Sequence, residues 1–183
     1  MDRSLVEFTS AYSVGRVLRH KFGGPDRVPE SVLQRGIDVH EWTEHYDLGQ
    51  LVTPAPHLKG WCDAYKAFTY ACSPSWEDNG VERIFDTGSY HGVVDRIGSM
   101  RGHDLCVADI KTGAPRSKGV DGIQLAAYTA AIYPKEALSV LRVGIYIKND
   151  GTWKLRVYDN PQDFAVWNTL LQEVTHDTNT AHS

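Results

Sequence analysis

The residues with the clearest chemical potential lie in the segment LCVADIKTG, residues 105–113. Four residues suited to a buried β-strand lead directly into Asp109, Ile110 and Lys111, and a threonine and a turn glycine follow. Burying an unpaired carboxylate or ammonium group is costly unless something compensates its charge. A strand that ends with one group of each sign therefore indicates either a simple ion pair or a ligand that engages both. On spacing alone, both interpretations stay open.

Alternation along a strand decides which of these side chains share a surface. Asp109 and Lys111 lie on the same face as the apolar residues at 105 and 107, whereas residues 106, 108 and 110 occupy the other face. Both faces begin apolar, which is typical of a central strand covered on both sides. The charges then emerge at the carboxyl end of the strand, where α/β sheets place their ligand-binding clefts.

A second carboxylate occurs upstream, at Asp95 in the apolar segment GVVDRIG. A tight hairpin would set this strand beside the one that carries Asp109. Two neighbouring carboxylates repel each other unless a proton or a cation lies between them. Mg²⁺ favours one or two carboxylates, with water and phosphate oxygens completing its shell. Beside such an ion, Lys111 could orient or deprotonate a water molecule and hold a phosphate.

These segments together resemble the RecB-type branch of the PD-(D/E)XK nuclease superfamily. The motifs are GVVDRIG, ADIKTG and QLAAY, preceded by RGIDVHEW, which carries a Gly-x-x-x-His element at Gly36 and His40. They follow one another in the family's order over residues 35–130. The resemblance implies a restriction-endonuclease-like fold and a metal-dependent deoxyribonuclease. The branch includes the RecB nuclease domain and many phage exonucleases, so an exonuclease is expected.

The resemblance also implies the composition of a metal site. His40, Asp95 and Asp109 would bind one or two Mg²⁺ or Mn²⁺ ions, together with the backbone carbonyl of Ile110. Lys111 would be the catalytic lysine, and Asp95 and Asp109 would share in catalysis through the ion. The reaction would be the attack of a metal-activated water molecule on a phosphodiester.

Gln124 and Tyr128 are four residues apart, so they share one face of a helix. The resemblance implies that both line the cleft and contact the DNA backbone. Further cationic residues are candidates for DNA contacts, near the active site or on the first helix: Arg116, Lys118, Arg16 and Arg19. For the loop pair at 116 and 118, a solvated loop is the alternative.

Other residues allow two interpretations each. Glu82 lies on the strand before the one that carries Asp95. It either adds a carboxylate to the site or is a solvated charge at the sheet edge. Arg96 belongs to the family motif, but a structural ion pair explains it equally well. Trp42, Trp61 and Tyr65 could stack on single-stranded bases, or they could belong to the core.

The elements that must position these residues follow from periodicity and turn signals. The expected helices span residues 10–21, 30–47, 61–70, 123–133 and 162–174, and the expected strands span 81–87, 90–99, 104–112, 139–148 and 152–159. The helix after DIKTG should cross over and place the fourth strand parallel to the third. We therefore expect an α/β fold with a central mixed sheet flanked by helices.

The chain should form one domain, with a helical segment over residues 1–75, an α/β core over 76–176 and a flexible tail over 177–183. The net charge of −4 excludes a generic polycation, but not local binding of DNA. Three scattered cysteines without a C-x-x-C pair disfavour an iron–sulfur cluster, structural zinc and a disulfide framework. No signal peptide or membrane span is visible.

The expected setting is the cytoplasm of a bacterium or phage-infected cell. DNA ends would be the substrate, and recombination or replication proteins are possible partners. Two alternatives are a structure-specific endonuclease of the same fold and an inactive DNA-binding relative. Strand preference, DNA versus RNA and oligomeric state are left open.

Overall fold

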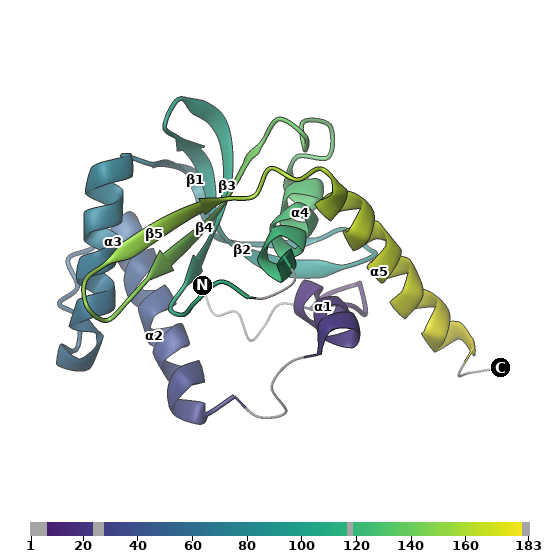
Figure 1. Ribbon diagram of the computed structural model, residues 1–183, viewed down its shortest axis with the longest axis horizontal. Helices are drawn as coiled ribbons and strands as arrows, with labels where there is room; N and C mark the ends of the chain where they lie inside the picture. Colours follow the sequence, from purple (N-terminus) through teal and green to yellow (C-terminus); the bar gives the residue numbers. More distant parts are fainter. Residues whose placement is uncertain (1–6, 24–27, 117–118, 181–183) are drawn as a thin grey trace.

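The structure is a computed structural model that describes residues 7–23, 28–116 and 119–180, with side chains described as far as residue 177. Within this part of the chain, the strands form a single sheet in the order β1-β2-β3-β4-β5 (Figure 1). The strands are β1 (Ser75–Asp86), β2 (His91–Met100), β3 (His103–Lys111), β4 (Leu141–Ile147) and β5 (Trp153–Val157). The helices are α1 (Val14–Phe22), α2 (Glu30–Asp47), α3 (Lys59–Cys72), α4 (Val120–Ile132) and α5 (Gln162–Thr180), with a short 3₁₀ helix at Pro56–Leu58.

The sheet is mixed, as the sequence predicts. Strands β1, β2 and β3 form an antiparallel meander. The turn between β2 and β3 has φ of 52° at Arg101 and 80° at Gly102, the positive values that a two-residue hairpin turn uses. Helix α4 then crosses over so that β4 runs parallel to β3, and β5 returns antiparallel to β4. The parallel crossover and the hairpin at residues 149–151 are both confirmed.

Helices cover both faces of this sheet (Figure 1). Helices α1, α4 and α5 pack on one face, whereas α2 and α3 pack on the other. Along β3, Val107 joins the first cluster, and Cys106, Ala108 and Ile110 join the second, each at most 1% exposed. The prediction that β3 is a central strand with two apolar faces is therefore confirmed. None of the helices in the described part combines the length and apolar character that crossing a membrane requires.

Several element boundaries differ from those predicted, and helix α1 begins at Val14 rather than at residue 10. Strand β1 begins at Ser75 rather than residue 81, because Ser75 pairs with Ser99 ahead of a register shift. The polar residues EDNG lie at this shift and gave no sign of a strand in the sequence. Gly98 permits this approach, since a Cβ there would lie 2.1 Å from the Ser75 carbonyl oxygen. Helix α4 begins at Val120 rather than residue 123, and α5 continues to Thr180 instead of ending at 174.

Strands β2 and β3 separate at the end where the charged residues lie. Their pairing extends to Arg96 opposite Ala108. Beyond that pair, the backbone N–H of Ile110 donates to the Asp95 side chain, with 2.6 Å between Ile110 N and Asp95 Oδ2. A carboxylate thus replaces a strand partner. The resulting gap gives side chains from both helical layers access to the same place.

Candidate metal centre

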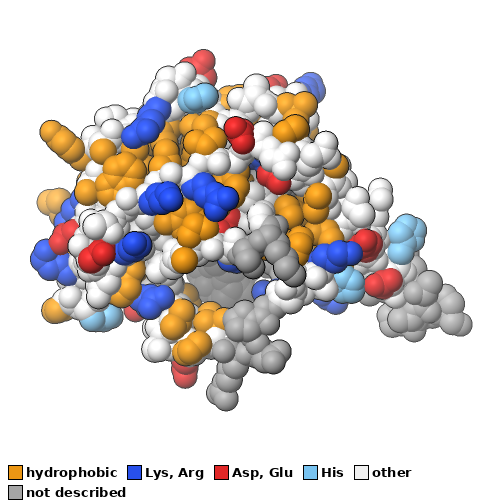
Figure 2. All heavy atoms as spheres, in the orientation of Figure 1, with side chains coloured by type: hydrophobic (Ala, Val, Ile, Leu, Met, Phe, Trp, Pro, Cys, Tyr) orange, Lys and Arg blue, Asp and Glu red, His pale blue; other side chains and the backbone are white. Residues whose placement is uncertain are grey.

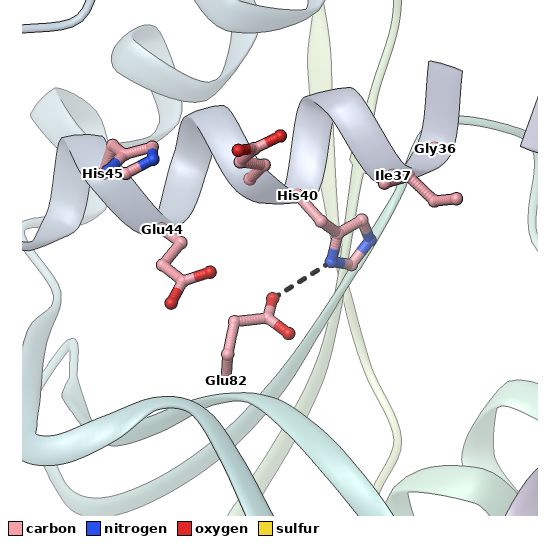
Figure 3. Close-up of a pocket in the computed structure, with 7 residues that line it drawn as sticks. Gly36, Ile37, His40, Glu44, His45 and Glu82 are labelled. Atoms are coloured by element: carbon pink, nitrogen blue, oxygen red, sulfur yellow. Dashed lines mark hydrogen bonds and ion pairs between the residues drawn. The ribbon is translucent and has the colours of Figure 1, made fainter. Parts of the chain in front are cut away.

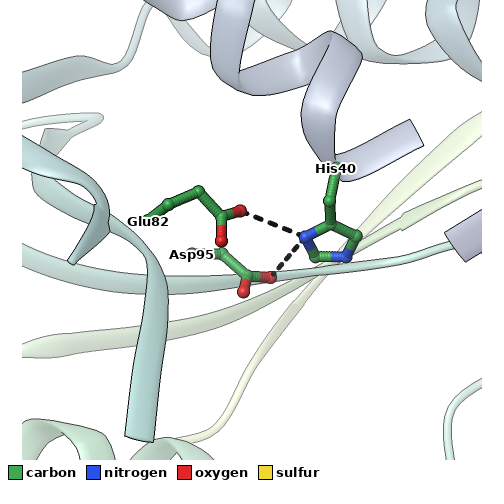
Figure 4. A group of neighbouring side chains, drawn as sticks. All are labelled: His40, Glu82 and Asp95. Atoms are coloured by element: carbon green, nitrogen blue, oxygen red, sulfur yellow. Dashed lines mark hydrogen bonds and ion pairs between the residues drawn. The ribbon is translucent and has the colours of Figure 1, made fainter. Parts of the chain in front are cut away.

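Three side chains from three elements converge at one place (Figure 4). His40 comes from α2, Glu82 from β1 and Asp95 from β2. His40 Nδ1 lies 3.2 Å from Glu82 Oε1 and 3.7 Å from Asp95 Oδ2. One ligand atom of each residue lies within 4.8 Å of the other two, so this group could hold a metal ion. His40 Nε2 also lies 3.1 Å from the carbonyl oxygen of Ile110.

Burial intensifies the electrostatics of this group. Glu82 is 9% exposed and Asp95 is 7% exposed, so water screens their charges poorly. Burial of His40 opposes its protonation, but Asp95 and Glu82 outweigh that effect and raise the pKa of His40 to about 9. A protonated imidazole therefore compensates the carboxylates in the metal-free protein. A dication would compensate them in its place.

The donor set fits a hard divalent ion. Two carboxylates and a backbone carbonyl are ligands that Mg²⁺ and Mn²⁺ accept, and a single imidazole is compatible with Mn²⁺. The sequence predicts His40, Asp95 and Ile110 as ligands, and the structure brings these three together. Asp109 lies outside the group of three whose ligand atoms are within 4.8 Å, and Glu82 is in it.

Glu82 is not the solvated edge charge that was one interpretation of the sequence. Besides His40, its carboxylate accepts from Arg96 Nη1 at 3.3 Å. Its backbone has φ of 50°, in the left-handed region that residues with a side chain rarely adopt. Such a conformation costs about 1 kcal/mol or more and persists where the surroundings impose it. The chain thus keeps a carboxylate at a position where glycine would be less strained.

Arg96 fixes this carboxylate from the core side. Its side chain is fully buried, and its Nε lies 2.5 Å from Asp47 Oδ2. Its Nη2 donates to the Thr43 hydroxyl at 2.9 Å. The structural ion pair that the sequence allowed is therefore confirmed. Because Asp47 and Thr43 belong to α2, Arg96 ties the His40 helix to the sheet.

Asp109 and Lys111 form the neighbouring part of the site. Lys111 Nζ lies 2.5 Å from Asp109 Oδ2, so the ion pair that the spacing allowed is present. Gln124 Nε2 donates to the other carboxylate oxygen, Asp109 Oδ1, at 2.9 Å. Burial raises the pKa of Asp109 to about 6 in spite of the nearby ammonium group. Asp109 points towards Lys111 and Gln124, and its role as a metal ligand stays a prediction.

Helix α4 places Gln124 and Tyr128 beside this pair. Gln124 Nε2 also donates to the Tyr128 hydroxyl at 2.7 Å, and Gln124 Oε1 lies 3.5 Å from Lys111 Nζ. One amide group therefore connects the carboxylate, the ammonium group and the phenol. The two residues share a helical face that points at the site, as their spacing predicts.

Arg116 is linked to this network through a residue that the sequence interpretation did not single out. Its side chain contacts Asp121 and Gln124 Oε1, and its backbone N–H donates to Asp121 Oδ2 at 2.9 Å. Asp121 is 2% exposed and also accepts from the Tyr146 hydroxyl at 2.6 Å. An acidic residue in the first turn of α4 was the available signal, but the helix start was predicted three residues too late.

The remaining predicted residues lie elsewhere. Lys118 lies outside the described residues. Arg16 and Arg19 are exposed on α1, which packs against α4 and α5. Trp42 is 5% exposed and Tyr65 is fully buried, so both belong to the core and neither presents a surface for base stacking.

A cavity of about 630 Å³ lies beside the group formed by His40, Glu82 and Asp95, between α2 and β1. His40, Glu44 and Glu82 point into this space (Figure 3). Ile37 adds an exposed apolar side chain at its rim. Carboxylates on its wall repel phosphate groups, so a phosphate could approach His40 from this side after a cation has neutralised the wall.

Comparison with known proteins returned no matching family model and no matching curated protein. The residues of this chain place a potential cation site at the same end of the sheet as the pair formed by the half-buried Lys111 and the buried Asp109.

Proposed function

We propose that this protein is a metal-dependent deoxyribonuclease with a restriction-endonuclease-like fold, related to the RecB-type PD-(D/E)XK enzymes. The observation that supports the proposal best is the convergence of His40, Glu82 and Asp95 at the gap between β2 and β3. This gap adjoins the Asp109–Lys111 pair. A cation next to a lysine can activate a water molecule and stabilise the charge that develops during hydrolysis of a phosphodiester.

The residues divide the chemical work between them. His40, Glu82, Asp95 and the carbonyl of Ile110 would hold Mg²⁺ or Mn²⁺. When bound, such an ion supplies a Lewis acid for the phosphate and lowers the pKa of a coordinated water molecule. Lys111 would hydrogen-bond the attacking water or a phosphate oxygen.

The contacts around Lys111 give it a defined position for that role. Asp109 and Gln124 hold its ammonium group from two sides. Gln124 is itself held by Tyr128. A lysine fixed in this way loses less side-chain entropy on binding a phosphate than a freely rotating one does. Arg116 is held next to the same amide and would bind a phosphate oxygen with charge-assisted hydrogen bonds.

We further propose that the enzyme acts on DNA ends in bacterial or phage recombination, repair or replication, in the cytoplasm. A structure-specific endonuclease of the same chemistry is the alternative, and circular single-stranded DNA separates the two. An exonuclease leaves the circle intact, whereas an endonuclease linearises it. An inactive DNA-binding relative is less consistent with a site in which Asp95, Asp109 and Lys111 are all present and mutually arranged.

The decisive experiment uses end-labelled single- and double-stranded DNA, with Mn²⁺ or with EDTA, and reads product lengths on a gel. Wild-type protein should cleave in Mn²⁺ and not in EDTA. Lys111→Ala should lose about 100-fold or more in rate, the range for removing a group that acts in proton transfer or charge stabilisation.

A matched control is Lys135→Ala, because Lys135 is an exposed lysine that precedes β4, at the opposite end of the sheet from Lys111. It should retain the wild-type rate, and both variants should melt within a few degrees of the wild-type protein. If Lys111→Ala degrades DNA at the wild-type rate, the proposed mechanism is wrong.

A further inference from the structure

Strands β4 and β5 extend the face of the sheet that carries Asp109 and Lys111. The pairing register joins Asp109, through one residue of β4, to Arg156 of β5. It joins Lys111 to Lys154 in the same way. Residues in such a row point to the same side of the sheet. Two cations of the edge strand therefore share the face on which the catalytic lysine lies.

The opposite face of β5 is committed to packing. Trp153 and Leu155 pack against the α2/α3 cluster, and the Trp153 ring lies 5.6 Å from that of Phe68. Lys154 and Arg156 alternate with these residues and are exposed. Among the described residues, neither cation has a carboxylate oxygen within 4.0 Å. Figure 2 shows Lys and Arg side chains gathered over the part of the molecule where Figure 1 draws β5.

The side chain of Arg156 also packs on an aromatic ring. Its guanidinium group lies over the Tyr158 ring, 5.1 Å from the ring centroid. The Tyr158 hydroxyl lies 2.5 Å from that of Tyr146, which donates to Asp121. An arginine stacked on a fixed ring keeps the edge of its guanidinium group available for bidentate binding of a phosphate. The same Asp121 holds Arg116 next to Lys111.

We propose that the surface formed by Lys154 and Arg156 binds the backbone of a single DNA strand where that strand passes the active site. This inference rests on the proposed function, since it assigns a path to the substrate of that site. Two strand spacings of about 4.8 Å separate β3 from β5. The surface therefore lies about 10 Å from the Lys111 row, within reach of phosphates that neighbour the scissile one.

The charge distribution favours a nucleic acid as the ligand of the surface formed by Lys154 and Arg156. The chain as a whole carries a net charge of −4. Cationic side chains concentrated on one face therefore attract a polyanion to that face, although the protein as a whole does not attract it. Lys148, which follows β4, contributes less because Asp150 occupies the same turn.

The test measures binding without catalysis. Fluorescence anisotropy of a labelled oligothymidylate is recorded in EDTA over a range of salt concentrations, for the wild-type protein and for Lys154→Gln/Arg156→Gln. Removing two phosphate contacts from a single strand should reduce the slope of log K against log salt by about 1.4. Relative to binding in 1 M salt, this corresponds to a loss in affinity of about 25-fold at about 0.1 M salt.

The matched control is Arg101→Gln/Lys135→Gln, which removes the same charge from exposed residues outside this surface. It should leave the slope unchanged, and melting curves should show that both double variants are folded. The proposal is overturned if the β5 variant keeps the wild-type slope, if the control loses affinity equally, or if the wild-type protein shows no salt-sensitive binding.

Cleavage assays separate this inference from the proposed function. A wild-type protein that binds the strand through Lys154 and Arg156 but never cleaves it supports the surface and refutes the nuclease. A protein that cleaves DNA while the β5 variant binds like the wild type supports the nuclease and refutes the surface.

Discussion

Protonation of His40 should make the stability of the metal-free protein depend on pH in a defined window. Folding raises the pKa of His40 from 6.5 to about 9, because Asp95 and Glu82 outweigh the effect of burial. The folded state therefore binds more protons than the unfolded state between these two values. The stabilisation is complete below about pH 6.5 and is lost as the pH rises through about 9.

The size of the effect follows from the same shift. Each unit of pKa difference corresponds to about 1.4 kcal/mol, so the full change is about 3 kcal/mol. The His40 side chain is 27% exposed, and water screens part of the interaction. A loss of between about 2 and 3 kcal/mol in the free energy of unfolding is therefore expected between pH 6 and pH 9.5.

The measurement is urea unfolding in EDTA at a series of pH values, followed by circular dichroism. His40→Gln keeps a hydrogen-bonding side chain but cannot titrate, so its free energy of unfolding should lack this decrease. His103→Gln is a control at an exposed histidine in β3 and should behave like the wild-type protein. A wild-type protein with constant stability over this range, or a His40→Gln variant with the same decrease, would refute the assignment of a protonated imidazole between two carboxylates.

Two further predictions concern the framework of the site. Arg96→Met should destabilise the protein by about 3–5 kcal/mol in urea unfolding, because it removes the buried guanidinium group that pairs with the carboxylates of Asp47 and Glu82. Arg101→Met, at an exposed turn, should change stability by less than about 0.5 kcal/mol, and equal losses would contradict the buried network. Gly60→Ala should destabilise by about 1–3 kcal/mol, because its Cβ would lie 1.7 Å from the Asn149 carbonyl oxygen. Gly36→Ala, in an open position of α2, should instead stabilise by up to about 1 kcal/mol, so a neutral Gly60→Ala would contradict the close packing of α3 on the β4–β5 turn.

The parts of the fold that the sequence predicts are those governed by local patterns. Continuous apolar letters around Val107 indicate a strand covered on both sides, and the helix that follows fixes a parallel partner. Local patterns do not predict the first half of β1. Its residues are polar, and they are held in the sheet by pairing with β2 beside Gly98, which is a contact distant in sequence.

The site shows the same division. The resemblance to the nuclease motifs implies His40, Asp95 and Ile110 as ligands, and the structure places these three residues together. The orientation of Asp109 towards Lys111 depends on Gln124, which comes from a helix on one particular side of the sheet. No local pattern contains that information.

The burial of Glu82 depends on a similar long-range contact. Its carboxylate is held by Arg96, which in turn pairs with Asp47 at the end of α2. The role of Asp121 was hidden by the misplaced start of α4. In each case the missing information is a tertiary partner rather than a residue type.

The site draws residues from both packing layers, since His40 arrives with α2 on one side of the sheet and Gln124 with α4 on the other. Parts of a protein can unfold locally as cooperative units, at a lower free-energy cost than global unfolding. Detachment of either layer would dismantle one half of the site while leaving the other folded. The fraction of active protein would then be the fraction in which both helical layers are packed on the sheet. Heat inactivation should therefore begin at a lower temperature than the loss of hydrogen-exchange protection in the central strand β3.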